Sequence, residues 1–249
     1  MSKILIYDTE TTSLEKPFCY NVGYVVYDTD ERKVLLTEEY VCEQVWHNPM
    51  LFTTAYYADK RPFYVKAMRT RNAKLEKFGY ICRRITRIIK DYDIHEAYAY
   101  NGSFDEKVFN FNCDWFKCIN PFDNVKLLDI RGYFHYIIDS NFINWCDDNE
   151  KFTDSGNYST TAETVYQFIS GNDDFEESHT ALDDSRIETE ILIYCLDKGC
   201  ELGKNYIAKR SITRNTIKQF VVKKNGEELL NVECSNIMFR KKSNTVLLK

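Results

Sequence analysis

The stretch that most constrains the fold is Lys3–Leu14, KILIYDTETTSL, in which a β-prone apolar run ends in a carboxylate, a threonine and a second carboxylate. Residues two apart in a strand point to the same face, so Asp8 and Glu10 are expected to project together from the strand end. Two neighbouring anions need a compensating cation, and hard oxygen ligands suit Mg²⁺ or Mn²⁺. A solvated turn also accounts for one such pair, so its meaning depends on further carboxylates.

Two more segments bring carboxylates to the junctions of predicted elements. The segment YNGSFD, residues 100–105, follows a short alternating stretch typical of a strand, and Asp105 opens an apparent helix. The segment HTALDD, residues 179–184, leads into a stretch whose apolar positions recur at helical spacing. Asp184 is therefore predicted near the start of a helix, with His179 in the loop before it.

In this order the three motifs resemble those of the DnaQ-like, or DEDDh, 3′-to-5′ exonucleases of the ribonuclease H-like superfamily. The matching residues are DTETTSL for the first motif, NGSFD for the second, and His179 with Asp184 for the third. The resemblance covers roughly Met1–Lys198 and leaves the C-terminal stretch unexplained. Ser13 stands where the family commonly has glycine, which puts the local turn in question more than the chemistry.

The resemblance implies metal ligands at Asp8, Glu10, Asp105 and Asp184, with His179 as the residue that marks the DEDDh branch. Carboxylates are acceptor-only groups suited to hold two Mg²⁺ or Mn²⁺ ions about 3.5 to 4 Å apart. One ion would lower the pKa of a bound water, and the other would stabilise the departing 3′ oxygen. His179, with an ordinary pKa of about 6.5, is suited to accept the proton of the attacking water.

Asp183 competes with Asp184 for the third motif. The family's spacing places the metal ligand five residues after the histidine, which selects Asp184. One residue earlier on a helix points about 100° away. Asp183 is therefore predicted to cap the helix or to support the site from outside it.

Five further residues match family positions that contact substrate or orient the site: Thr9, Thr11, Leu14, Asn101 and Phe104. By resemblance, Asn101 and Phe104 pack and orient the site. The other three would contact the terminal nucleotide through backbone, a hydroxyl and an apolar wedge. Plain strand-end structure is the alternative interpretation for those three.

The sequence predicts an α/β fold, a ribonuclease H-like mixed five-stranded sheet flanked by helices. The predicted strands are Ile4–Tyr7, Val22–Tyr27, Val34–Val41, Ala97–Tyr100 and Val125–Ile130. The predicted helices, besides those that follow the second and third motifs, are Asn72–Tyr92, Arg131–Ile138 and Thr160–Ile169. Residues Asp139–Ser159 are expected to form a polar surface excursion.

Beyond Gly203 the pattern changes to short strands. They are predicted at Thr216–Val222, Leu229–Val232 and Thr245–Leu248. Asn225-Gly226 is a strong hairpin-turn signal. We therefore divide the chain into an exonuclease domain, residues 1–203, and a basic β-rich extension, residues 204–249, suited to bind nucleic acid, a partner or a second copy.

Positive charge is concentrated in two segments, although the chain carries a net charge of −5. Residues 60–90 contain eleven Lys or Arg and one acid, and residues 204–249 contain eleven and three. Such local basic surfaces attract phosphates, while solubility is an equally good reason for lysine-rich helices. Aromatic residues in Val45–Tyr64 suggest a platform for unpaired bases, but a loop that covers the core is favoured.

Several other classes of protein are disfavoured. No apolar stretch approaches the roughly 20 residues that span a bilayer, and no secretion signal is recognised. The nine cysteines lie scattered without a CxxC pair, so reduced thiols are expected and structural zinc is not. We expect a cytoplasmic protein with no membrane partner. Many Tyr, Asn and Lys residues would suit a phage, and then the host cytoplasm.

The combined prediction is a metal-dependent 3′-to-5′ exonuclease. It would act on single-stranded or frayed 3′ ends, with DNA slightly favoured over RNA, and release nucleoside 5′-monophosphates. The alternative is a nucleic-acid-binding module or proofreading-type subunit whose own cleavage is weak or lapsed, docked on a polymerase or another replication partner.

Overall fold

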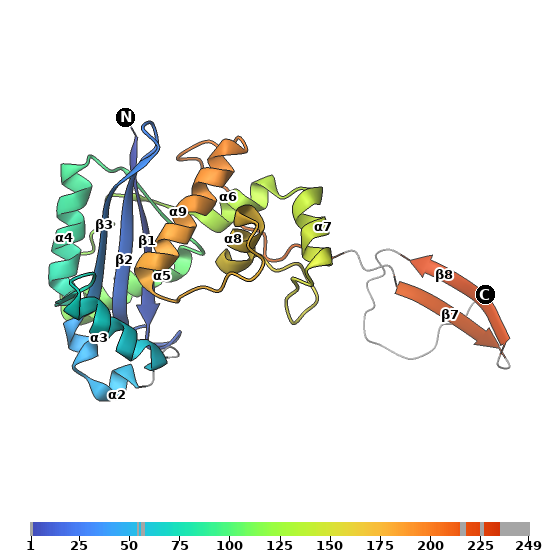
Figure 1. Ribbon diagram of the computed structural model, residues 1–249, viewed down its shortest axis with the longest axis horizontal. Coiled ribbons are helices and arrows are strands. Elements are labelled where there is room, and N and C mark those ends of the chain that lie inside the picture. The colour runs from blue at the N-terminus through green and yellow to red at the C-terminus, as the bar shows by residue number, and fades with distance from the viewer. Residues whose placement is uncertain (1, 54, 56–57, 215–217, 225–226, 235–249) are drawn as a thin grey trace.

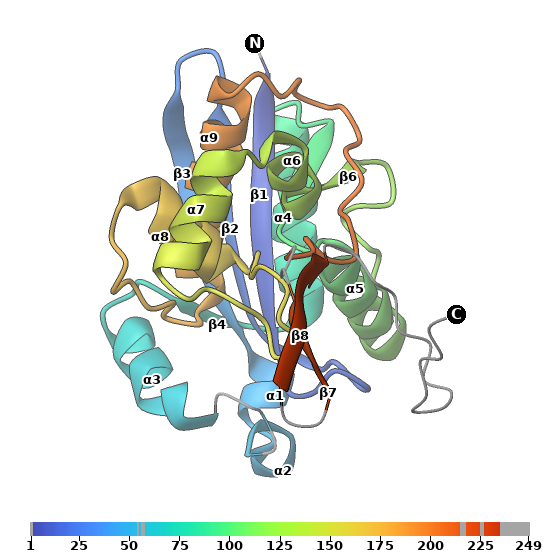
Figure 2. The same cartoon turned by 90° about the vertical axis from the view of Figure 1, so that its right-hand side faces the viewer.

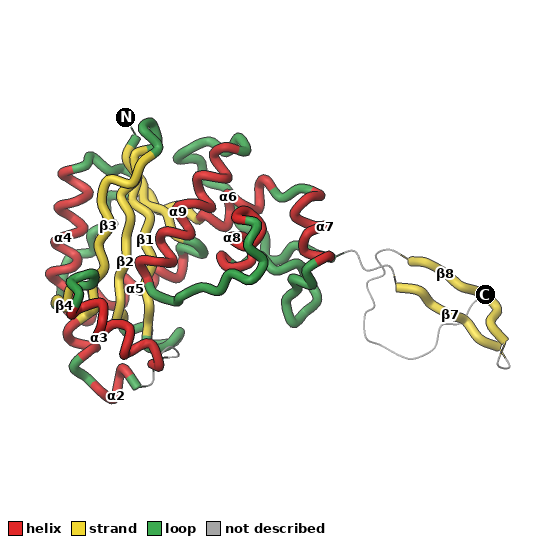
Figure 3. Tube along the Cα trace, in the orientation of Figure 1, coloured by secondary structure: helices red, strands yellow, loops and turns green. Residues whose placement is uncertain are grey.

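The main body of the protein is a six-stranded mixed sheet with helices on both faces (Figure 1, Figure 3). The computed structural model describes residues 2–53, 55, 58–214, 218–224 and 227–234. The strand order is β4-β3-β2-β1-β5-β6. The strands are β1 Lys3–Thr11, β2 Cys19–Asp28, β3 Lys33–Cys42, β4 Lys74–Glu76, β5 Glu96–Ala99 and β6 Lys126–Asp129. The predicted α/β, ribonuclease H-like sheet is confirmed, with β4 added to the five strands expected.

Helices cover both faces of this sheet. One face carries α4 Phe78–Asp91 and α5 Ser103–Phe116, and the other carries α6 Ile130–Ile137, α8 Ala162–Ser170 and α9 Ala181–Asp197 (Figure 1, Figure 2). The other described helices are α1 Glu43–Trp46, α2 Pro49–Phe52, η1 Ala58–Lys60, α3 Arg61–Arg69 and α7 Ser140–Asp148. Within the described ranges, no helix is both long enough and apolar enough to cross a membrane.

Strand β1 separates two hydrophobic cores. Leu5 and Tyr7 belong to the core beneath α4 and α5, whereas Ile4 and Ile6 belong to the core beneath α9. Because successive residues of a strand alternate between faces, Asp8 continues the series that faces α9. The pattern of the strand thus directs the first carboxylate toward the face that α9 covers.

Helix α9 lies directly against β2 at Gly23. A Cβ atom at Gly23 would lie 2.1 Å from the backbone nitrogen of Leu182 in the first turn of α9. The Ser185 hydroxyl donates to the Gly23 carbonyl over 3.1 Å. Only glycine permits this approach, and Gly23 is paired with Asp8 across the β1–β2 ladder.

The buried side chain of Asn21 holds the beginning of the same helix. Its amide oxygen accepts from the Ala181 backbone N–H over 2.8 Å and from the Tyr64 hydroxyl over 3.0 Å. Its amide nitrogen donates to the Tyr40 carbonyl over 2.9 Å. The first N–H groups of a helix have no hydrogen-bond acceptor within the helix, and Asn21 supplies that acceptor for Ala181.

The predicted helix Asn72–Tyr92 is wrong in its first part. Residues Lys74–Glu76 form β4, which pairs in parallel with the end of β3, and α4 begins at Phe78. The apolar spacing continued through this segment, but pairing also satisfies backbone groups at the edge of β3. This tertiary demand outweighed the local helical pattern.

The segment Val45–Tyr64 covers the core. Trp46, Phe52 and Tyr64 are buried, and the Arg61 guanidinium lies 4.4 Å from the centre of the Trp46 ring. These three side chains are occupied by packing, whereas Phe63 is 42% exposed, and Tyr56 and Tyr57 lie outside the described residues. This outcome agrees with the interpretation favoured from the sequence.

The predicted surface excursion Asp139–Ser159 also contains structure. It includes α7, in which Phe142 and Cys146 are buried against the second core. The segment is rich in polar residues, so its sequence pattern did not indicate that Phe142 and Cys146 are buried and hold the helix in place. The prediction of a purely polar excursion is therefore wrong.

The first part of the C-terminal extension packs against the main body. Tyr206 is buried, and its ring centre lies 4.8 Å from that of Tyr133 on α6. Further along, β7 Lys218–Lys224 and β8 Glu227–Cys234 pair in antiparallel fashion. The predicted turn Asn225-Gly226 and strand Thr245–Leu248 lie outside the described residues. The division of the chain after residue 203 stays a prediction.

Three thiols gather between α4 and α5. The Cys82 sulfur lies 3.8 Å from that of Cys113 and 3.9 Å from that of Cys118. The eight cysteines from Cys19 to Cys200 are free. Cysteines that are scattered along the sequence are thus partly gathered in space, which the absence of a short-range motif could not reveal.

The contact at Gly23 makes a testable prediction. Gly23→Ala should lower the free energy of unfolding by about 3 kcal/mol, because the new methyl overlaps backbone atoms of Ala181 and Leu182. The measurement is denaturant unfolding. Gly79→Ala on α4 is the matched control, because its Cβ would meet Cys118 at an ordinary 3.5 Å. Equal stability of the two variants would contradict the close packing of α9.

Candidate functional site

Three predicted site residues converge at the N-terminal end of α9. Glu10 comes from the end of β1, His179 from the loop before α9, and Asp184 from the first turn of α9. Ligand atoms of these three side chains all lie within 4.8 Å of one another. Residues from opposite ends of the folded domain's sequence thus form one compact group.

Asp8 and Asp105 belong to the same acidic cluster. Asp105 is 2% exposed in the first turn of α5, where its carboxylate accepts from the Thr9 hydroxyl over 2.6 Å. Burial raises the pKa of Asp8 well above its usual range, and the nearby charges of Asp105, Glu188 and Asp184 add to this rise. All four predicted metal ligands therefore act on one another electrostatically.

The other carboxyl groups of the cluster are also shifted toward the protonated form. Burial raises the pKa of Asp105 to about 7, although the hydrogen bond from Thr9 opposes this shift. Burial, with the charges of Glu177 and Asp183, raises the pKa of Asp184 to about 8. A group of buried carboxylates this close together retains protons unless a cation compensates their charge.

The structure adds Glu188, which the sequence did not single out. Glu188 lies one turn beyond Asp184 on α9 and is only 3% exposed. Burial raises its pKa well above the usual range, and the charge of Asp105 adds to the rise. Its Oε2 atom has no hydrogen-bond partner among the described residues. The sequence did contain a signal for Glu188: it is an acidic residue at helical spacing from Asp184, on the helix face that also carries the apolar Ile191.

His179 is held in a backbone conformation that few residues adopt, with φ of +52°. Its Nδ1 atom lies 3.8 Å from Glu177 Oε2, and burial lowers its pKa, helped by the positive charge of Lys60. The imidazole is therefore neutral near pH 7. A neutral imidazole beside the cluster is able to accept a proton.

Asp183 is bound outside this cluster. Its carboxylate accepts from the hydroxyls of Ser178 over 3.1 Å and Thr180 over 3.2 Å, and it pairs with Arg186 over 2.8 Å. These contacts fasten the loop that carries His179 to the start of α9. The Asp183 carboxylate thus supports the site from outside the cluster, as predicted from the sequence.

Two of the predicted substrate-contacting residues already have intramolecular partners. The Thr9 hydroxyl is committed to Asp105, and the Thr11 hydroxyl donates weakly to the Ser13 carbonyl over 3.4 Å. Leu14, by contrast, is 74% exposed and presents an apolar surface to solvent. Contact of these residues with a nucleotide stays a prediction.

Asn101 and Phe104 shape the approach to Asp105. Asn101 has a φ of +59°, and its backbone N–H donates to the Asp129 carboxylate over 2.9 Å. Phe104 is partly buried against the core beneath α5. Their role in orienting the site stays a prediction.

The cluster has the donors that a hard divalent cation requires. The Oδ1 atom of Asp184 and the Oε2 atom of Glu188 are buried, and neither has a partner within the described ranges. Carboxylate oxygens with little nitrogen and no sulfur suit Mg²⁺ or Mn²⁺. The residues present therefore fit such ions.

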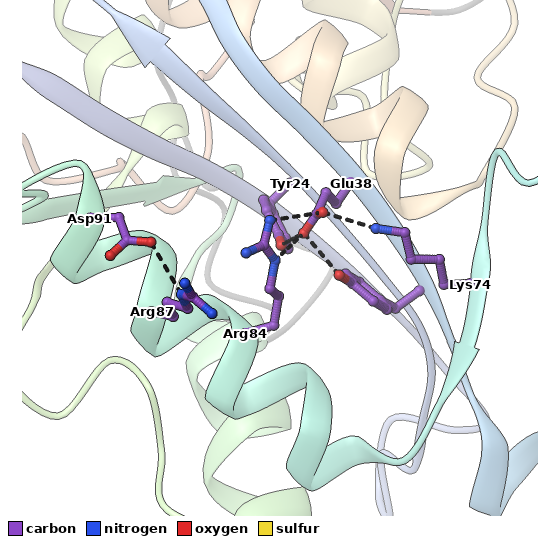
Figure 4. A network of polar contacts seen from close by, with 7 residues as sticks. Tyr24, Glu38, Lys74, Arg84, Arg87 and Asp91 are labelled. Atoms are coloured by element: carbon purple, nitrogen blue, oxygen red, sulfur yellow. Dashed lines mark hydrogen bonds and ion pairs between the residues drawn. The ribbon is translucent and has the colours of Figure 1, made fainter.

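A second polar network, centred on Glu38, lies on the face of the sheet that α4 covers (Figure 4). The nearly buried Glu38 accepts from Lys74 and Arg84, each over 2.9 Å, and from Tyr24 and Tyr40. Burial opposes ionisation of Glu38, but these hydrogen bonds outweigh it and lower its pKa to about 2. Part of the predicted basic surface is thus neutralised within the protein.

Comparison with known proteins shows similarity in structure alone. No protein-family model matches the chain, and no curated protein matches it. The nuclease domain of 3′hExo, a DEDDh family member bound to rAMP, matches over 83% of this chain and 98% of that domain, with a TM-score of 0.55 and 16% identity.

Two other solved structures agree. A 3′-exonuclease whose structure concerns recognition of the 3′ end of a histone mRNA stem-loop matches over 93% of this chain and 70% of its own, with a TM-score of 0.53 and 18% identity. Cell-death related nuclease 4 matches over 80% and 65%, with a TM-score of 0.53 and 14% identity. This chain has the DnaQ-like, ribonuclease H-like fold of the DEDDh 3′-exonuclease domains.

Proposed function

We propose that this chain is a metal-dependent exonuclease that hydrolyses the 3′ ends of single-stranded or frayed nucleic acid to nucleoside 5′-monophosphates. The observation that carries the proposal is the convergence of Glu10, His179 and Asp184 within 4.8 Å, next to Asp8 and Asp105. A strand of either sugar type would suit the acidic cluster, and we favour DNA slightly.

The cluster supplies a site for two divalent ions, which we propose are Mg²⁺ or Mn²⁺. Asp8, Glu10, Asp105 and Asp184 would hold them. When bound, such ions would neutralise charge at the scissile phosphate and at the departing 3′ oxygen. The raised pKa values of Asp105 and Asp184 support this role. Buried carboxylates without a cation are hard to ionise, and a bound cation would compensate their charge.

His179 is the proposed general base. The oxygen of a water molecule bonds to phosphorus while the bond from phosphorus to the 3′ oxygen breaks. The proton of that water passes to the neutral imidazole, and the 3′ oxygen takes up a proton from solvent. Glu177, near the imidazole, would stabilise the imidazolium that forms.

Leu14 and Asn101 are proposed to position the terminal nucleotide. Leu14 presents an exposed apolar side chain after β1, and Asn101 lies at the entrance to α5. An apolar side chain that packs on the last base would separate it from its neighbour. Thr9, Thr11 and Phe104 would hold the surrounding backbone in place.

The direct test is digestion of DNA and RNA oligonucleotides labelled at the 3′ or the 5′ end. With Mg²⁺ or Mn²⁺ we expect stepwise shortening from the 3′ end. Asp184→Asn should lower kcat/KM about a thousandfold or more, because a carboxylate that holds cations is lost.

Asp114→Asn is the matched control, because it removes one carboxylate at an exposed position of α5. It should retain activity within a few-fold. Strand binding without cleavage by the parent chain would favour the alternative, a binding or proofreading-type subunit. An equal loss of activity in the control variant and in Asp184→Asn would contradict the assignment of Asp184 as a metal ligand.

The raised carboxyl pKa values also predict how the metal-free protein responds to pH. Asp105 and Asp184 titrate at about 7 and 8 in the folded chain, but at about 4 when unfolded. Above the unfolded value the folded chain holds more protons, so its stability should fall as pH rises through 7 and 8. The measurement is the melting temperature in EDTA between about pH 6.5 and 8.5, where histidines contribute little.

Two comparisons identify the source of this fall. Adding Mn²⁺ should raise the melting temperature more at the higher pH, because the cation binds ionised carboxylates. Glu188→Gln should make the fall in EDTA shallower, because one buried acid can no longer ionise. A melting temperature that is constant or rises with pH in EDTA would contradict the buried acidic cluster.

A further inference from the structure

A second cavity lies beside the loop that leads to Asp105. It encloses about 370 Å³ and is lined by Tyr100 and Asn101, by Arg131 and Arg210, and by hydroxyl groups that include Thr160. No aspartate or glutamate is among the described residues that line it. The acidic cluster and this cavity therefore lie at the same end of β5 but have opposite chemistry.

A chain of hydrogen bonds determines the state of the Thr160 hydroxyl. The Lys209 backbone N–H donates to His135 Nδ1 over 2.9 Å, so the ring proton of neutral His135 resides on Nε2. Burial, together with the positive charges of Arg131 and Lys209, lowers the His135 pKa to about 4, which keeps the ring neutral.

The Nε2–H group therefore donates a hydrogen bond to Thr160 Oγ1 over 2.9 Å. The guanidinium of Arg131 donates to the same oxygen over 3.4 Å. The Thr160 carbonyl accepts from Tyr100 over 2.7 Å. Because Thr160 Oγ1 already accepts these hydrogen bonds, its own O–H group is left to donate to a further acceptor.

Arg131 contributes another unused donor. Its Nε atom is buried and has no hydrogen-bond partner among the described residues. The N-terminus of α8, which begins after Thr161 at the edge of the cavity, adds partial positive charge. Buried donors without acceptors are costly, so the cavity is built for a ligand that accepts hydrogen bonds and carries negative charge.

Three contacts hold the segment that brings Arg210 to the cavity. Ile212 pairs with Tyr158 by an isolated β-bridge, and Lys209 is bound to His135. The Tyr206 carbonyl comes so close to α6 that a Cβ atom on Gly132 would lie 1.9 Å from it. Arg210 is thus placed by a fixed segment, although its side chain is exposed.

We propose that this cavity binds a backbone phosphate of the nucleic-acid strand whose 3′ end occupies the acidic cluster. The inference rests on the proposed function for the identity of the strand. Tyr100 and Asn101 line the cavity, Asn101 lies four residues before Asp105, and Glu188 of the cluster is hydrogen-bonded to the Tyr100 backbone. A strand that leaves the cluster along this loop would meet the cavity. Arginines bind phosphate oxygens through paired N–H groups, and helix termini and hydroxyls complete such sites.

The test uses the full chain carrying Asp184→Asn, so that strands bind without being cleaved. Arg210→Gln should weaken binding of a fluorescent single-stranded oligonucleotide about tenfold. It should also reduce the slope of log affinity against log salt by about 0.7, the value of one phosphate contact. The control is Arg83→Gln, an exposed arginine on α4 across the sheet, which should change neither quantity.

Thr160→Val and Thr160→Ser test the hydroxyl without changing charge. Valine should weaken binding and serine should retain it, and thermal unfolding checks that both variants fold. Inorganic phosphate should compete with the oligonucleotide for the parent cavity. Competition by phosphate in a protein whose strand affinity is unchanged by Arg210→Gln would identify a free-anion site and overturn the proposal.

Failure of the proposed function would be recognised separately. If the chain never shortens a 3′ end but Arg210→Gln still weakens strand binding, the cavity assignment stands and the exonuclease assignment falls. If the chain shortens 3′ ends and Arg210→Gln and Thr160→Val bind like the parent, the cavity assignment falls. An equal loss in Arg83→Gln would attribute the effect to general positive charge, which also overturns it.

Discussion

The seating of α9 on β2 is the contact on which the rest of the site depends. Asp8 and Glu10 on β1 are paired in the ladder with Gly23 and Asn21 on β2. Those two β2 residues are also the ones that receive α9, Gly23 by having no side chain and Asn21 by accepting a helix N–H group. The same two rungs of the sheet therefore carry the acids of β1 and the helix that carries Asp184. Any shift in register would separate them.

This arrangement forces together groups that repel one another. Five carboxyl groups are buried or half-buried around the end of β1; burial raises the pKa of each, and the charges of nearby carboxylates add to the rise. Such a cluster reduces stability, so the remainder of the domain must hold it. The two hydrophobic cores on either side of the sheet, together with the fully bonded Asn21, supply that support. The site is stable only as part of a packed domain, which is the condition for a preorganised cation site.

The sequence was most informative where local periodicity and motif spacing agreed. Alternation along β1 predicted that Asp8 and Glu10 share a face, and the spacing of the family that the chain resembles selected Asp184 rather than Asp183. It was least informative where a distant strand or helix decided the outcome. Strand β4 exists because β3 offers an edge, and Glu188 belongs to the cluster because α9 rests on Gly23. The cavity beside Asn101 combines residues from four separate segments, so no single motif could reveal it.

The two chemical environments at the end of β5 complement each other. The acidic cluster consists of acceptors and repels a phosphate unless cations are present. The cavity is lined by two arginines together with hydroxyl and amide groups, which would suit a phosphate without cations. Tyr100 and Asn101 lie between the two, with the Tyr100 hydroxyl bound to Thr160 and the Asn101 N–H bound to Asp129. A phosphodiester strand that touched both would be held by the cavity independently of metal, and would be drawn into the cluster only when cations had neutralised it. Under the proposed function, the fold would separate the holding of the strand from the chemistry at its end.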